Sequence, residues 1–111
     1  MTGVWEERAA RNEALFREVN EKVEAVSRKF GFDHATETVA FVCECSDETC
    51  MEHLRIPIAI YEAVRADPRR FIVRAGHETE IERVVGRHDG CVIVEKEGTA
   101  GKIAVQTDPR S

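Results

Sequence analysis

Three of the four cysteines lie within eight positions, in the stretch Phe41-Val-Cys-Glu-Cys-Ser-Asp-Glu-Thr-Cys50, and an apolar run flanks this stretch on each side. Cys43 and Cys45 are two residues apart, so in an extended chain both sulfurs point to the same side. The four residues before Cys50 are enough for a turn that brings the third sulfur back. Clustered thiols at a turn between two apolar runs are typical of a metal knuckle, and we predict one over residues 43–53.

Three sulfurs need one further ligand to complete a tetrahedral zinc site, and histidine is the usual partner in a Cys3His set. His53 follows Cys50 by three residues and would complete the site within the same loop. His77 follows Gly76 at the end of a separate predicted strand, so it would cross-link the knuckle to the second half of the chain. The spacing supports the two histidines about equally. Three thiolates and one imidazole around a single Zn2+ leave no open coordination position, which indicates a structural site.

The same cysteines allow two other kinds of site. An iron–sulfur cluster is one, although three cysteines and a histidine are an unusual ligand set for it. A redox pair is the other, with a disulfide between Cys43 and Cys45 and with Cys50 as the resolving thiol. Redox thiols are activated by nearby positive charge, which should be lacking here. The residues around these thiols are instead acidic: Glu44, Asp47, Glu48 and Glu52.

Few other residues suggest catalysis. The sequence has no Gly-x-Ser-x-Gly elbow, no phosphate loop and no His-Glu-x-x-His pattern. Glu78, beside His77, would serve as an acid or base only at an open metal site, and its simpler interpretation is a carboxylate that supports the ligand or lies on the surface. We therefore predict a protein without enzymatic activity; the alternatives are a thiol- or metal-based redox sensor and a metal-dependent hydrolase.

Residues 5–30 contain neither glycine nor proline, and apolar residues recur there at steps of three and four. These apolar residues are Phe16, Val19, Val23, Val26 and Phe30. Such spacing predicts a long helix with one apolar face, ended by Gly31 as a C-terminal cap. Acids placed four residues before bases, as in Glu13–Arg17 and Glu24–Arg28, predict ion pairs on its other face. We expect the apolar face to cover a sheet; the alternative is a homodimer in which it pairs with a second copy as a short coiled coil.

In the rest of the chain, runs of β-branched and aromatic residues mainly predict strands. We predict these over residues 38–43, 54–58, 71–75, 81–87 and 91–95. Asp89-Gly90 between the last two is a strong hairpin signal. Short helices are predicted over residues 60–66, before Asp67-Pro68, and over residues 100–106. The predicted fold is α+β: a small, mostly antiparallel sheet, with the long N-terminal helix across one face and a zinc knuckle at one end.

Length and charge limit the organisation and the partners. A chain of 111 residues with 42% hydrophobic residues predicts a single domain, residues 1–111. The formal charge is −5, and the one local group of bases, at Arg69, Arg70 and Arg74, is interpreted as a solvated strand end, so a nucleic-acid partner is not expected. The sequence shows neither a secretory signal nor an apolar run long enough to span a membrane. We expect a cytoplasmic protein. In the reducing cytoplasm, clustered cysteines indicate metal binding more often than disulfides.

Several further motifs accompany Val42-Cys-Glu-Cys45 and Cys50: the run Tyr61-Glu-Ala-Val-Arg-Ala-Asp-Pro-Arg-Arg-Phe71, Gly76-His-Glu78, Glu82-Arg-Val-Val85, Val94-Glu-Lys96 and the opening Arg11-Asn-Glu-Ala-Leu-Phe-Arg-Glu-Val-Asn20. Together these motifs resemble a family of short, mostly actinobacterial proteins of uncharacterised function. The resemblance spans nearly the whole chain and implies a ligand set of Cys43, Cys45, Cys50 and His77, with Cys91 as an incidental thiol. It implies no activity. We therefore expect a small zinc-binding protein with a structural Cys3His site that acts as a protein-interaction or regulatory module.

Overall fold

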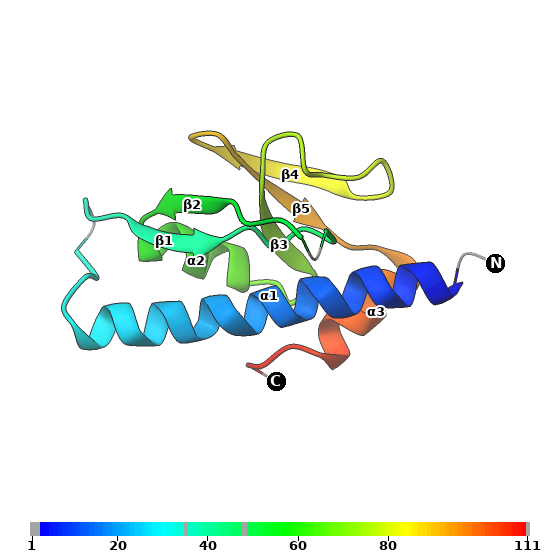
Figure 1. The fold of residues 1–111 in the computed structure, drawn as a ribbon, viewed down its shortest axis with the longest axis horizontal. Helices are drawn as coiled ribbons and strands as arrows, with labels where there is room; N and C mark the ends of the chain where they lie inside the picture. The colour runs from blue at the N-terminus through cyan, green and yellow to red at the C-terminus, as the bar shows by residue number, and fades with distance from the viewer. Residues whose placement is uncertain (1–2, 35, 48, 111) are drawn as a thin grey trace.

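The computed structural model describes residues 3–34, 36–47 and 49–110, with side chains from residue 8 onward. The chain forms a long helix, two small antiparallel sheets and two short helices, which confirms the predicted α+β class (Figure 1). The elements in order are α1 (Gly3–Lys29), β1 (Val39–Val42), β2 (His53–Ile56), α2 (Ile58–Arg65), β3 (Arg70–Arg74), β4 (Arg83–His88), β5 (Cys91–Glu95) and α3 (Gly98–Gln106).

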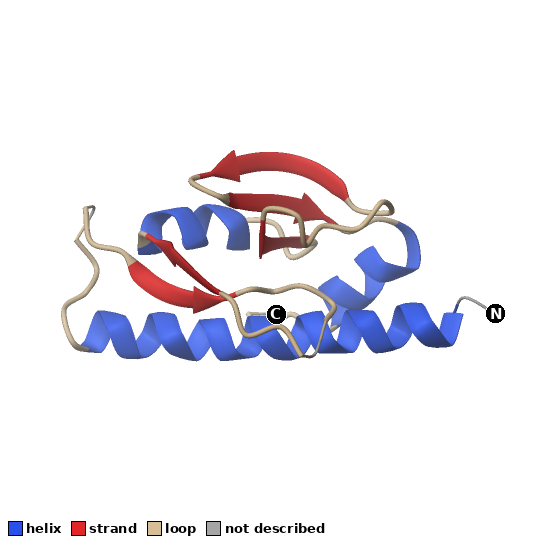
Figure 2. Ribbon diagram, turned by 45° about the horizontal axis from the view of Figure 1, so that its top comes forward, coloured by secondary structure: helices blue, strands red, loops and turns tan. Residues whose placement is uncertain are grey.

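Helix α1 runs the full length of the molecule along one side, and the two sheets lie above it (Figures 1 and 2). Gly31 ends it as predicted, with a φ of +81° that suits glycine. The Gly31 N–H donates to the Arg28 carbonyl at 3.0 Å, and the Phe32 N–H donates to the Ser27 carbonyl at 2.9 Å. These two bonds form a Schellman motif, which satisfies carbonyls that the helix end would leave free.

The strands form two sheets where one was expected. β1 and β2 make a two-stranded hairpin with Val42 opposite His53, and the second sheet has the order β3-β5-β4. The Asp89-Gly90 hairpin between β4 and β5 is confirmed, with His88 opposite Cys91. Pro57 ends β2 and stands at the N-terminus of α2, because proline lacks the N–H that a further ladder bond requires.

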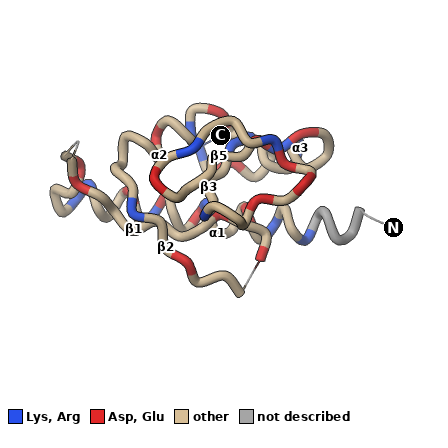
Figure 3. Tube along the Cα trace, turned by 90° about the horizontal axis from the view of Figure 1, so that it is seen from above, with Lys and Arg blue, Asp and Glu red and all other residues tan. Residues whose placement is uncertain are grey.

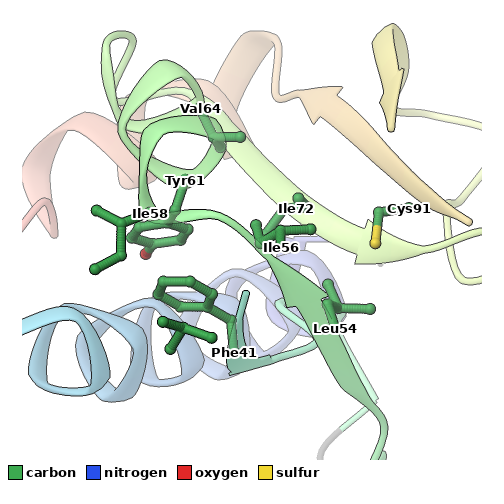
Figure 4. Packing of buried hydrophobic residues seen from close by; sticks show 9 residues of the cluster. Phe41, Leu54, Ile56, Ile58, Tyr61, Val64, Ile72 and Cys91 are labelled. Carbon is green, nitrogen blue, oxygen red and sulfur yellow. The ribbon is translucent and has the colours of Figure 1, made fainter. Parts of the chain in front are cut away.

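The three-stranded sheet buries side chains on both faces, because successive residues of a strand point to opposite sides. Ile72 and Cys91 pack into a core with the β1–β2 hairpin and α2, where the rings of Phe41 and Tyr61 stack at 4.5 Å between centroids (Figure 4). The opposite face packs into a second core. Its members are Cys43, Cys45, Phe71, Val73, Val92, Val94 and Ala104. The predicted metal knuckle is therefore part of a hydrophobic core.

The face that α1 buries is not the predicted apolar one. Its buried residues are Ala10, Glu13, Ala14, Arg17, Asn20 and Glu24. Of the apolar set, Val19, Val26 and Phe30 are exposed, so the expectation that they cover a sheet is wrong. The predicted ion pair Glu24–Arg28 is present at 3.7 Å.

Buried polar side chains anchor α1 to the core. Arg17 donates from Nη1 to the Pro68 carbonyl and from Nη2 to the Ala104 carbonyl, each at 2.6 Å, while its guanidinium stacks 4.5 Å from the Phe71 ring centroid. Glu13 pairs with Lys96 instead of Arg17. The long side chain of Arg17 thereby satisfies carbonyls near α3 that apolar residues would leave unpaired.

Acidic and basic residues are interspersed along the chain (Figure 3). The arginines that formed the one local basic group each pair with acids: Arg69 and Arg70 with Glu95, and Arg74 with Glu52. Within the described residues, no helix is both long and apolar enough to cross a membrane.

Candidate metal centre

The knuckle leaves the end of β1 and folds back toward β2. The Cys43 N–H donates to the Glu52 carbonyl at 3.1 Å, which continues the hairpin ladder by one pair. Beyond it, the Cys50 N–H donates to the Asp47 carbonyl at 3.0 Å, and Asp47 Oδ1 accepts from the Thr49 N–H at 2.9 Å. These bonds form the turn expected from a turn-forming aspartate, and they return Cys50 toward the first two cysteines.

His77 reaches the knuckle from the segment after β3. Gly76 has a φ of +97°, a conformation that residues with a side chain rarely adopt, and it turns the chain so that the His77 N–H donates to the Arg74 carbonyl at 2.9 Å. Glu78 Oε1 accepts from the Gly76 N–H at 2.7 Å and so closes the same turn. Glu78 thus acts as a local cap beside His77.

The structure brings together the four residues that the family resemblance implies. One donor atom from each of Cys43, Cys45, Cys50 and His77 lies within 4.8 Å of all the others. His77 Nδ1 is 3.7 Å from Cys43 Sγ and 3.5 Å from Cys50 Sγ. A tetrahedral zinc with its usual bond lengths would hold a sulfur and a nitrogen about 3.6 Å apart. These two distances are compatible with ligands of a single ion.

The size of this group also distinguishes one ion from a cluster. An iron–sulfur cluster spreads its cysteines around two or more iron atoms, whereas these four donor atoms all lie within 4.8 Å of one another. Three sulfurs and one nitrogen are the donors that zinc accepts in closed sites. The geometry fits a mononuclear site better than an iron–sulfur cluster.

Burial opposes the thiolate form of two of the sulfurs, and one backbone hydrogen bond acts against this effect. Cys43 and Cys45 are buried, and burial is the main reason that the pKa of both thiols lies above its usual value. The Arg74 N–H donates to Cys43 Sγ at 3.2 Å, a bond that stabilises a thiolate and acts against this rise. A dication would supply the larger compensation, since metal binding requires deprotonated sulfur.

Glu44 has a role that the sequence did not reveal. Its position between two cysteines suggested an acid beside the thiols, but its side chain is buried and points into the core. Oε2 accepts from Asn20 Nδ2 and from the Tyr61 hydroxyl, both at 2.8 Å, and Oε1 accepts from the Ile72 N–H at 3.0 Å. Burial raises the pKa of Glu44 above its usual value, against these hydrogen bonds.

This carboxylate fixes the knuckle between α1, α2 and β3. The Glu44 N–H also donates to the Ile72 carbonyl at 2.9 Å, so the knuckle pairs with the outer edge of β3. Asn20 adds two bonds of 2.8 Å to the backbone of Val42, one to its N–H and one to its carbonyl. Cys43 and Cys45, on either side of Glu44, are thereby held in place by the protein itself.

The other candidates lie elsewhere. His53 is exposed at the first position of β2 and lines a surface hollow with Arg74 and Cys91. Among the described residues, the group of possible metal ligands does not include it. Cys91 is buried in the other core, across the sheet from Cys43. Glu52 is exposed, and Glu48 lies outside the described residues.

Comparison of the sequence and fold with known protein families, with curated proteins and with solved structures finds no match in any of the three. The resemblance to the actinobacterial family therefore stays a prediction. What the structure itself shows is a Cys3His group able to hold a metal ion, placed within an α+β fold.

Proposed function

We propose that this is a small zinc-binding protein of the cytoplasm, in which one Zn2+ occupies the Cys3His group as a structural ion and the protein acts by contact with another protein. The observation that carries the proposal is the convergence of four zinc-type donors within 4.8 Å, from two segments that are far apart in the sequence. Residues 43–50 belong to the connection between β1 and β2, and His77 follows β3.

An ion held by both segments would join the two sheets. The knuckle already pairs with β3 through Glu44 and Ile72, and a bond to His77 would close the same junction from the other side. A domain of this size has limited burial to stabilise it. Structural zinc contributes directly to folding free energy, which supports a structural role for the ion.

Protein contact is supported by what the knuckle presents to solvent. Met51 follows the last cysteine, and 86% of its surface is exposed. An exposed, flexible apolar side chain is a common contact in adaptable protein interfaces. A four-ligand site leaves no position for substrate, so an interaction role fits it better than hydrolysis. Glu78, the acid that a hydrolase would need, instead caps a turn.

The alternative function, a redox sensor, requires that the same thiols be reactive toward oxidants. A reactive cysteine has a lowered pKa and access to solvent, whereas burial raises the pKa of Cys43 and Cys45. A structural site should keep its zinc in mild peroxide, while a sensor should release zinc reversibly as the thiols oxidise. Zinc release measured with a colorimetric chelator distinguishes the two.

The decisive experiment uses the purified full chain. We expect close to one zinc per chain by elemental analysis, and loss of the folded circular dichroism spectrum when a strong chelator removes it. His77→Ala should lower zinc affinity by at least about tenfold, with His53→Ala as the matched control. A protein that contains no metal and remains folded would refute the structural-zinc proposal.

The interaction role is tested separately. Partners captured on the zinc-loaded protein should be lost after Met51→Ser, which leaves the ligands intact and should not change zinc content. Partner binding that is unchanged by Met51→Ser and by zinc removal would contradict contact through the knuckle.

A further inference from the structure

Helix α1 carries a row of apolar side chains on the side that faces away from the core. Leu15, Val19, Val26 and Phe30 are 56%, 38%, 55% and 69% exposed. The helix forms the lower edge of the molecule in Figure 2, and no other described element lies below it. The summed exposure of the four residues is about that of two fully exposed apolar residues, and all four lie along one side of the helix. We call these four residues the outer stripe.

The spacing of the outer stripe is symmetric about its centre. Leu15 and Phe30 lie equally far from the midpoint between Lys22 and Val23, and so do Val19 and Val26. A two-fold axis through that midpoint would place each residue of the stripe opposite its mate on a second, antiparallel helix. Self-complementarity of this kind is what an isologous two-fold interface requires.

The charges beside the stripe fit the same arrangement. Glu18 and Lys29 are exposed on one flank of the stripe. In the antiparallel register, Glu18 comes within about 3 Å, along the axis, of Lys29 on the second copy, and the symmetry repeats this pair. A parallel arrangement would instead set each charge beside its own copy, which is repulsive.

We propose that the outer stripe is the contact surface of a homodimer, in which two α1 helices pack antiparallel around an axis between Lys22 and Val23. Residues 15–30 cover only about 24 Å of helix, and one helix pair of that length buries less area than a standard interface. Lys22 lies close to the axis and meets its own copy there. The dimer should therefore be weak, with a Kd of roughly 1–100 µM.

The proposed dimer contact uses none of the possible metal ligands, which come from the knuckle and from the turn after β3. The prediction of bound zinc and the prediction of a dimer can thus be refuted independently of each other. A monomer that holds zinc would overturn this inference alone, and a dimer without zinc would overturn only the proposed function.

Sedimentation velocity of the full chain between about 5 µM and 500 µM tests the inference. We expect a concentration-dependent shift from monomer to dimer. Val26→Glu should weaken it by at least about 30-fold, because it places two charges in the apolar contact. Lys22→Leu should tighten it by about tenfold, because it removes the repulsion at the axis. Val105→Glu, at an exposed valine of α3 outside the outer stripe, is the matched control.

A charge exchange tests the antiparallel register. Glu18→Lys and Lys29→Glu should each weaken the dimer, and the double variant should restore the wild-type Kd. Circular dichroism of every variant verifies that the helix is intact. A monomer at all concentrations, a dimer that survives Val26→Glu, or a double variant no tighter than the singles would each overturn the proposal.

Discussion

Replacement of Glu44 tests how the protein positions its metal ligands. The carboxylate accepts three hydrogen bonds inside the core, from Asn20, Tyr61 and the Ile72 N–H. Glu44→Ala removes this acceptor from all three donors, although Asn20 Nδ2 keeps its second bond, to the Val42 carbonyl. An unsatisfied buried donor costs about 1–3 kcal/mol, so we expect a loss of about 4 kcal/mol in the free energy of unfolding. For a chain of this length, that lowers the Tm by roughly 15 °C.

Glu44→Gln separates the hydrogen bonds from the volume of the side chain. Glutamine keeps an acceptor for the Ile72 N–H, and the Tyr61 hydroxyl can rotate to accept. Its amide group faces the amide of Asn20, donor against donor, so one bond is lost. We expect a cost of about 1–2 kcal/mol, well below that of alanine. Glu52→Gln is the control, because an exposed ion pair contributes at most about 1 kcal/mol.

Urea unfolding of the zinc-saturated proteins gives the free energies, and an unchanged slope verifies that the same transition is compared. Zinc competition gives a second reading: Glu44→Ala should weaken affinity by roughly 10–100-fold, as loss of a group that orients ligands does. If Glu44→Ala lies within about 1 kcal/mol of the wild type, then Glu44 does not hold the knuckle and our reasoning about the site is wrong.

Two further predictions concern the end of the chain near α3. Burial raises the pKa of Glu13, beside Lys96, from 4.5 to about 7. The folded protein therefore binds the Glu13 proton more tightly than the unfolded chain, and this stabilises the fold fully below pH 4.5 and is lost as the pH rises through about 7. Relative to Glu13→Gln, the wild type should lose up to about 3 kcal/mol of unfolding free energy between pH 4.5 and 8. Urea titration at each pH measures this loss. Parallel curves for the two proteins would contradict this. Gly101→Ala should destabilise the protein by about 1–3 kcal/mol despite alanine's higher helix propensity, because the added Cβ would come 2.9 Å from the Lys96 carbonyl oxygen. Thermal unfolding of this variant beside Lys102→Ala, an exposed position of the same helix, measures the effect, and a raised Tm would refute the steric argument.

Local patterns in the sequence predicted most of the elements. The Asp89-Gly90 turn, the stop at Pro57 and the cap at Gly31 depend on the few residues around them, so each could be identified without knowledge of the fold. The division of the strands into two sheets could not be identified in this way. It depends on how the knuckle packs against the edge of β3, and that contact joins residues 28 apart, Glu44 and Ile72.

Helix α1 shows why a pattern of apolar residues can mislead. The sequence rule assumes that the most apolar face is the buried one, but this helix buries a face with Glu13, Arg17 and Asn20. Each of these finds a specific partner far along the chain, such as Ala104 for Arg17 and Glu44 for Asn20. Because such pairings depend on tertiary contact, no local rule reveals them.

The metal group was predicted in part from residues and in part from resemblance. The spacing of the three cysteines indicated the knuckle, because short-range geometry brings their sulfurs together. The choice between His53 and His77 could not be made from spacing, since it depends on where β3 ends relative to the knuckle. The supporting bonds from Arg74 and Glu44 were missed for the same reason.

X-ray absorption at the zinc edge of the purified protein reports the ligands of the ion directly. We expect stoichiometric zinc with about three sulfur neighbours at roughly 2.3 Å and one nitrogen at roughly 2.0 Å, and loss of the nitrogen signal in His77→Ala but not in His53→Ala. A first shell made mainly of oxygen and nitrogen, or a folded protein that takes up no zinc, would contradict this prediction.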